Sequence, residues 1–168
     1  MYQPTRRAPL GIPESRLIAS FSLLSLVIGG HDLGSYRYGC EALPEQIDYF
    51  LRLLIATKQA GYHLQALKAS LTAFDDIRRD VVQEQVLAPL IDKHPEVEFV
   101  VDHQRQHGRS YYQSAGFQVY IVDPSGKSYN LVEGGFTDWT QQLLSNRKER
   151  LLISGLGSER LVSCFWNS

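Results

Sequence analysis

A turn sequence between two apolar, aromatic-rich stretches is the strongest constraint on how this chain can fold. Asp123-Pro124-Ser125-Gly126 joins residues that favour a turn to a glycine that tolerates a positive φ. The segments on either side, 111–122 and 127–132, are predicted strands, and so the turn predicts a β-hairpin. The chain is therefore expected to contain an antiparallel sheet.

The first half of the chain is predicted to be mainly helical. Between about residues 44 and 60, apolar side chains recur at helical spacing, and Gly61 closes the pattern. A second helix is expected from about 73 to 93, where Pro89 should kink it or split it in two. Residues 14–28 are also predicted to be a helix, ended by the glycine pair that follows.

The second half is predicted to be rich in strands. Helices first and strands later favour an α+β fold, with an antiparallel sheet flanked by helices. We expect an extended segment over 1–13, which holds three prolines, and a single domain over 14–168. The remaining predicted elements are strands at 63–69, 97–101 and 151–154, and helices at 139–144 and 159–165.

A glycine-rich segment near the C-terminus carries the first functional signal. Gly155-Leu156-Gly157-Ser158-Glu159-Arg160 follows the apolar run 151–153, which predicts a buried strand, a two-glycine turn and a helix start. Glycines lack a Cβ atom, so a ligand or another backbone can approach closely there. Arg160 adds a planar cation that can stack on a base or clamp a phosphate. An ordinary turn, with Arg160 paired to an acid, is the structural alternative.

Two further segments give this signal a context. Gly108-Arg109-Ser110-Tyr111-Tyr112 precedes Phe117-Gln118-Val119-Tyr120, and Glu133-Gly134-Gly135-Phe136-Thr137-Asp138 comes later. In this order and spacing, the three segments resemble the catalytic core of class II histidyl-tRNA synthetases and their relatives. They are similar to the family's "RGLDYYTG…FE" element, its "GGRYD" element and its motif 3 "GxGxER" signature. Tyr38-Gly39-Cys40-Glu41 resembles the tail of motif 2, and the resemblance spans about residues 38–165.

The resemblance implies a class II synthetase-like core with a ligand site. In that family the arginine matched by Arg160 stacks on the adenine of ATP, so ATP, another adenine nucleotide or histidine is the implied ligand. Tyr111 and Tyr112 would face opposite sides of their predicted strand, and both can be purely structural. Asp138 can cap the helix that follows it. The candidate ligand-binding residues are Tyr111, Tyr112, Gly134, Gly135, Gly155, Gly157 and Arg160.

Departures from the family pattern argue against catalysis. His107, Ser110, Gln118 and Phe136 stand where the family has charged side chains. Motif 1 and an anticodon-binding domain have no counterpart. We therefore predict no catalytic residue and a degenerate, regulatory protein, like the regulatory subunit of ATP phosphoribosyltransferase in histidine biosynthesis. Two alternatives stay open, which are a histidine–tRNA ligase-type fragment that completes its site with another chain and a pure protein-interaction module.

Composition limits the partners and the location. A formal net charge of −1 gives no long-range attraction for nucleic acid or a membrane. The apolar run 17–30 is shorter than the roughly 20 residues that span a bilayer. Cys40 and Cys164 are expected to be small buried residues in a reducing cytoplasm. Self-association or a partner protein is expected, with residues 17–28 as a candidate contact surface.

A metal site is not expected. Asp102, His103 and His107 are the candidate ligands, but the surrounding residues predict a strand. Neighbouring side chains of a strand point to opposite faces, and residues four apart lie about 13 Å from each other. These three groups would therefore not converge on one ion.

Overall fold

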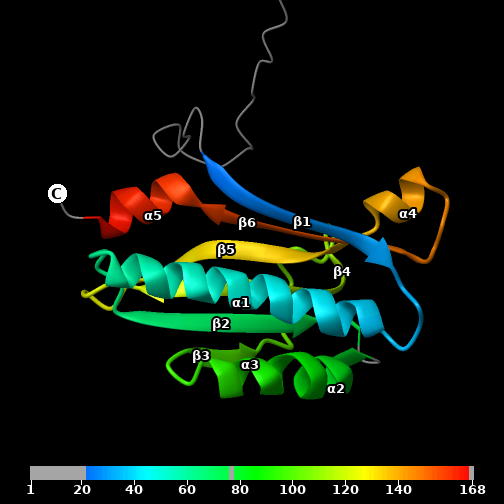
Figure 1. Ribbon diagram of the computed structural model, residues 1–168, viewed down its shortest axis with the longest axis horizontal. Helices are drawn as coiled ribbons and strands as arrows, with labels where there is room; N and C mark the ends of the chain where they lie inside the picture. The colour runs from blue at the N-terminus through cyan, green and yellow to red at the C-terminus, as the bar shows by residue number, and fades with distance from the viewer. Residues whose placement is uncertain (1–21, 76–77, 167–168) are drawn as a thin grey trace, which may run out of the picture.

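The computed structural model describes residues 22–75 and 78–166 and shows a six-stranded sheet with helices packed against it (Figure 1). The strand order is β1-β6-β5-β4-β2-β3, and every neighbouring pair is antiparallel except β2 and β3. The strands are β1 (Leu23–His31), β2 (Ala66–Ala73), β3 (Glu98–Val101), β4 (Gln113–Val122), β5 (Ser128–Thr137) and β6 (Glu149–Gly157).

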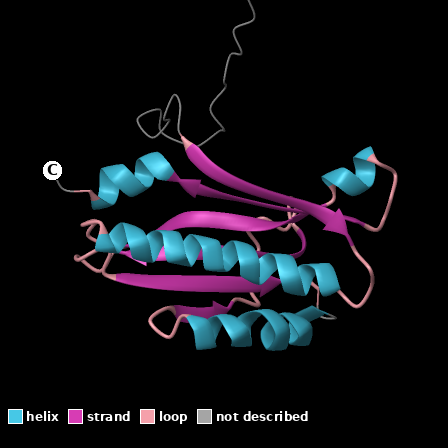
Figure 2. Ribbon diagram, viewed as in Figure 1, coloured by secondary structure: helices cyan, strands magenta, loops and turns pink. Residues whose placement is uncertain are grey.

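One long helix crosses the sheet, and shorter ones lie at its margins (Figure 2). The α+β class with an antiparallel sheet flanked by helices is thus confirmed. The helices are α1 (Arg37–Gln59), α2 (Arg79–Val82), the π-helical turn η3 (Gln83–Leu87), α3 (Ala88–Lys93), α4 (Trp139–Leu143) and α5 (Ser158–Phe165).

The two faces of the sheet differ in what covers them. The Ser154 hydroxyl donates to Oε1 of Gln46 on α1 at 2.6 Å, so β6 residues in phase with Ser154 face that helix. Side chains alternate along a strand, and so Ile153, Gly155 and Gly157 face the other way. We call these the α1 face and the open face. The main core lies on the α1 face, where side chains of α1 at helical spacing are fully buried: Leu43, Ile47, Phe50, Leu51 and Leu54.

The predicted hairpin is present as β4 and β5. The Asp123 carboxylate accepts hydrogen bonds from the backbone N–H of Ser125 at 2.8 Å and of Lys127 at 2.9 Å. Gly126 has a φ of 85°, which a glycine adopts without strain. The Ser125 hydroxyl and these two N–H groups hold the pKa of Asp123 below its usual value. The turn was predicted correctly, and β5 continues further than expected, to Thr137.

The prediction of a helix over residues 14–28 is wrong where it can be compared. Residues 23–31 form β1, which pairs in nine antiparallel positions with β6. Residues 14–21 lie outside the described part of the chain. A short apolar run fits a helix or a strand equally well by pattern, and pairing with the long β6 decides in favour of the strand.

The helices predicted at 139–144 and 159–165 match α4 and α5 to within one residue, whereas the two in the first half were right in type and wrong at their boundaries. α1 begins at Arg37, so Pro44 lies inside the helix rather than at its start. Ala73 ends β2, and the second helical segment starts only at Arg79. Pro89 follows a π-helical turn, so the predicted break near it is confirmed. Proline has no N–H to donate, and the wider π-helical turn directly before Pro89 accommodates the missing hydrogen bond.

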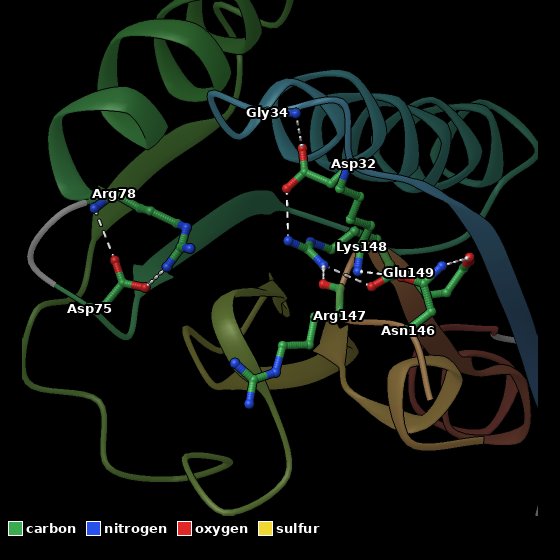
Figure 3. Close-up of polar contacts among 9 residues, drawn as sticks. Asp32, Gly34, Asp75, Arg78, Asn146, Arg147, Lys148 and Glu149 are labelled. Atoms are coloured by element: carbon green, nitrogen blue, oxygen red, sulfur yellow. Dashed lines mark hydrogen bonds and ion pairs between the residues drawn. The ribbon is translucent and has the colours of Figure 1, made fainter. Parts of the chain in front are cut away.

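The loop after β1 is fastened to the loop before β6 (Figure 3). The backbone N–H of Asp32 donates to the carbonyl of Lys148 at 2.8 Å, and the Asp32 carboxylate pairs with Arg150 at 2.7 Å. The same carboxylate accepts from the backbone N–H of Gly34 at 3.0 Å. These contacts fix the end of β1 beside the start of β6.

Candidate functional site

A cavity of about 650 Å³ lies on the open face, between the ends of β1, β5 and β6 and helix α5. Its exposed apolar lining comes mainly from Leu23, and Gly155 and Gly157 add bare backbone, whereas Leu131 and Val132 border it with buried side chains. Its polar lining includes Asn130, Glu133, Glu159 and Arg160. We call this hollow the α5 cavity. It contains three of the candidate ligand-binding residues, namely Gly155, Gly157 and Arg160.

The two glycines of this cavity lie in a strand and not in a turn, which corrects the sequence-based prediction. Both belong to β6, and α5 begins directly at Ser158. A Cβ added at Gly155 would come no closer than 3.9 Å to another atom, and one at Gly157 no closer than 3.6 Å. Packing therefore does not require glycine here. The missing side chains leave space above the strand.

A β-bulge shapes the opposite wall of the cavity. The β4–β5 register shifts between Val119 and Tyr120, which leaves Leu131 as an extra residue in β5. The carbonyl of Asn130, next to the bulge, accepts a hydrogen bond from Nη1 of Arg160 at 3.2 Å. The Oδ1 atom of Asn130 is buried and has no partner among the described residues. The wall thus offers a free hydrogen-bond acceptor beside a guanidinium.

The charges around the cavity nearly balance. Arg160 and Glu159 both line the cavity, and the Glu159 carboxylate accepts a hydrogen bond from the Ser22 hydroxyl at 3.1 Å. Glu133 is paired with Arg105 at 2.7 Å. No surplus of positive charge remains at this end of the open face, in the described part of the chain, to attract a polyphosphate.

The tyrosine pair lies at the other end of the open face, and it does not line the α5 cavity. Tyr111 and Tyr112 precede β4 and touch edge to face, with ring centroids 4.9 Å apart. The prediction that they point to opposite sides of a strand is therefore wrong. Tyr111 is exposed and contacts the Trp139 ring edge to face, whereas Tyr112 is only 8% exposed. Burial, and then the charge of Glu133, raises the pKa of Tyr112 to about 12.

A buried arginine, Arg105, completes this end of the open face. It is 5% exposed, and it donates from Nη2 to Glu133 and from Nε to the His107 carbonyl at 2.9 Å. Its guanidinium carbon lies 5.8 Å from the centre of the Tyr112 ring. This role of Arg105 was not predicted, because the residue stands between two glutamines and belongs to none of the three segments that resemble the family. We call Arg105, Tyr112, Glu133 and Gly135 the Arg105 cluster.

The glycine pair of the predicted site is explained by packing on both faces. A Cβ at Gly135 would lie 2.6 Å from the Tyr112 ring, and one at Gly134 would lie 2.6 Å from both Phe117 and Ser154. Gly135 therefore belongs to the Arg105 cluster on the open face, and Gly134 to the core on the α1 face. The next residue, Phe136, is also core, with its ring near those of two tyrosines. The seven candidate residues thus do not form one site.

Several other predicted residues have different surroundings from those expected. Cys164 is exposed and lines the α5 cavity, and Cys40 is half-buried, so neither is the buried residue that was predicted. Asp138 makes no capping hydrogen bond from its side chain and instead accepts from Gln142 at 2.8 Å. His107 is exposed, with its ring nitrogen 4.0 Å from Glu133. Over residues 22–75 and 78–166, no group of three or more histidines, cysteines or acids could hold a metal ion.

The part of the chain that the structure describes has no helix with the length and apolar character needed to cross a bilayer. That finding concerns α1 above all, since it is the longest helix and carries charged residues along its exposed side.

Comparison with known proteins gives matches in structure only. No protein-family model and no curated protein sequence matches this chain. The apo histidyl-tRNA synthetase of S. aureus is similar, with a TM-score of 0.58 and 21% identity over 85% of this chain and 39% of that one. A fragment of threonyl-tRNA synthetase from Cryptosporidium parvum Iowa II, named as its RNA binding domain, has a TM-score of 0.54 and 12% identity. It matches over 85% of this chain and 36% of its own.

This chain therefore spans about two fifths of the length of these synthetase structures. At such identities the likeness concerns the fold alone. The shared architecture is a six-stranded mixed sheet flanked by helices. The chain has the fold of a class II synthetase-like core.

Proposed function

We propose that this protein is a catalytically silent, synthetase-like binding protein that holds an adenine nucleoside or nucleotide in the α5 cavity and regulates a partner. The observation that carries the proposal is the placement of Arg160 above a glycine-floored, partly apolar hollow of about 650 Å³. A volume of this size suits a drug-sized ligand. The resemblance to the histidyl-tRNA synthetase family suggests adenine as the ligand's base.

The lining of the α5 cavity favours contacts with the base of an adenine nucleotide over contacts with its phosphates. Leu23 provides exposed apolar surface, and the guanidinium of Arg160 can stack on a planar heterocycle. The unpartnered Oδ1 of Asn130 is a ready acceptor for an exocyclic amino group. Glu159 opposes the charge of Arg160, so each added phosphate gains little. We expect adenosine and AMP to bind more tightly than ATP.

The Arg105 cluster supports the loss of catalysis. The family's charged positions are occupied here by His107, Ser110, Gln118 and Phe136, and of these Phe136 is buried in the core. Arg105, a buried guanidinium nearby, donates from Nη2 to Glu133 and from Nε to the His107 carbonyl, which leaves its Nη1 as a single unpartnered donor among the described residues. A developing charge on an activated amino acid would lack most of the family's fixed donors, each of which is typically worth about 3–4 kcal/mol.

Binding is tested by calorimetric titration with adenosine, AMP, ATP and histidine in separate runs. A second readout uses Cys164, whose exposed thiol lines the α5 cavity. In a Cys40→Ala background, a bound nucleoside should slow alkylation of Cys164 in proportion to occupancy. An absence of heat with all four ligands, together with unchanged alkylation, would refute the proposed site.

Arg160 variants connect binding to this cavity. Arg160→Ala should weaken binding by about 2–3 kcal/mol, and Arg160→Lys should recover little, because lysine lacks the planar group. Arg37→Ala is the matched control, since Arg37 is an exposed arginine paired with Glu41 on α1. Affinity that is equal in Arg160→Ala and in the control would place the ligand elsewhere.

A separate assay distinguishes the silent protein from an active ligase fragment. Histidine-dependent exchange of pyrophosphate into ATP should stay at background for the silent protein. The ligase-fragment alternative has one observation in its favour, which is that this chain spans only about two fifths of the synthetase structures. Exchange that is clearly above background and lost in Arg160→Ala would establish the ligase instead.

A further inference from the structure

The two edges of the sheet are protected to very different degrees. β3, at one edge, has four residues, and its Glu98 is paired with Lys68 of β2 at 2.8 Å. β1, at the other edge, has nine residues with the sequence LLSLVIGGH, in which no lysine, acid or proline occurs. Short length and charge are the usual means by which an edge strand avoids pairing with another chain. β1 has neither.

The exposed side chains of β1 are apolar. Val27, at the centre of the strand, is 63% exposed, and Leu23 is also largely exposed. Among the described residues, β1 pairs with β6 on one side and with no strand on the other. An unpaired row of backbone groups beside exposed leucine and valine favours pairing with a further strand.

A charged ridge on α1 runs alongside this edge. Glu45, Tyr49 and Arg52 recur at helical spacing, and all three border the groove that α1 forms with residues 26–28 of β1. Glu45 and Arg52 are exposed and carry opposite charges on either side of Tyr49. The ridge is therefore complementary to a copy of itself running in the opposite direction.

We propose that two copies of this chain associate through β1, in antiparallel register about Val27, to form one continuous sheet. A two-fold axis perpendicular to the sheet keeps both α1 helices on the same side and reverses their directions. Glu45 of each copy then lies opposite Arg52 of the other, while the β1 strands lie about 4.8 Å apart. Val27 meets its own copy at the axis. This association does not depend on the proposed function.

The first test measures mass by sedimentation velocity and light scattering. The parent chain should be a dimer whose melting temperature rises with concentration, and Val27→Lys should be a folded monomer whose melting temperature does not, because Val27 is mostly exposed in one copy. A parent chain that stays monomeric at high concentration overturns the proposal and leaves β1 to a different partner. So does a dimer that Val27→Lys leaves intact.

The second test uses the charged ridge. Glu45→Arg and Arg52→Glu should each weaken the dimer by about tenfold, because two exposed ion pairs become like-charge contacts. An equimolar mixture of the two variants should associate as a heterodimer with near-parental affinity. Asp92→Arg, on the exposed side of α3, is the matched control and should have no effect. If the mixture associates no better than either variant alone, the antiparallel register about Val27 is wrong.

Discussion

The two ends of the open face use the same residue types for opposite purposes. At the α5 cavity, Gly157 and Arg160 leave a hollow, with the nearest atom 3.6 Å from a Cβ built on Gly157. At the Arg105 cluster, Gly135 and Arg105 close the surface, and a Cβ on Gly135 would meet the Tyr112 ring at 2.6 Å. A glycine and an arginine in sequence therefore say little about whether a site is open. Whether the site is open or filled depends on which side chains the glycine faces.

The largest contrast is expected from alanine at the two glycines. Gly135→Ala should destabilise the fold by about 3 kcal/mol, because the added methyl group meets Tyr112 and the Ala115 carbonyl, which is backbone and cannot yield easily. Gly157→Ala should change stability by less than about 1 kcal/mol, since its surroundings are open. Urea unfolding of both variants measures the difference. Equal losses would show that the two ends are packed alike.

Removing Arg105 should lower the unfolding free energy more than removing Arg160, by a smaller margin than for the two glycines. Arg105→Met leaves Glu133 without its partner and should cost about 2 kcal/mol of unfolding free energy. Arg160→Met should cost less than about 0.5 kcal/mol, because Arg160 is exposed and, within residues 22–75 and 78–166, donates only to the Asn130 carbonyl. The double variant Arg105→Met with Glu133→Gln closes a mutant cycle. A coupling energy near zero would contradict a stabilising ion pair in the Arg105 cluster.

Alkaline unfolding separates the two tyrosines. The raised pKa of Tyr112, about 12 against about 10 in an unfolded chain, means that the unfolded state loses its proton first. The stability from neutral Tyr112 is therefore complete below about pH 10 and is lost as the pH rises towards 12. Tyr112→Phe should flatten this decline, whereas Tyr111→Phe should not. Tyr36, Tyr38 and Tyr120, whose pKa values burial also raises, contribute a further decline in both variants.

Much of the fold was predictable because local signals and tertiary contacts agree. The Asp123 turn is built from its own side chain and backbone, so a four-residue motif was sufficient to predict it. α1 carries its apolar stripe in its own sequence. β1 was predicted wrongly because its structure depends on β6, which lies more than a hundred residues away in sequence, as the pairing of His31 with Glu149 illustrates.

The candidate site was predictable only in part, for a related reason. Gly155, Gly157 and Arg160 are close in sequence, and they share the α5 cavity. Asn130 and Leu23 reach the same cavity from two other strands, and no local motif marks them. Arg105 became part of the open face through its reach to Glu133, a contact between residues 28 positions apart. Sequence motifs thus identified some of the residues on the open face. They did not show that the face is hollow at the α5 cavity and filled at the Arg105 cluster.

The pairing of the first described strand with the last has a consequence for synthesis of the chain. His31 and Glu149, which pair at the end of β1, are 118 positions apart. At typical synthesis rates of about 5–20 residues per second, β1 leaves the ribosome on the order of ten seconds before β6 can pair with it. During that interval an uncharged strand of leucine, valine and isoleucine has both edges free. Two nascent chains on one messenger would then be able to pair through β1 before either fold is complete.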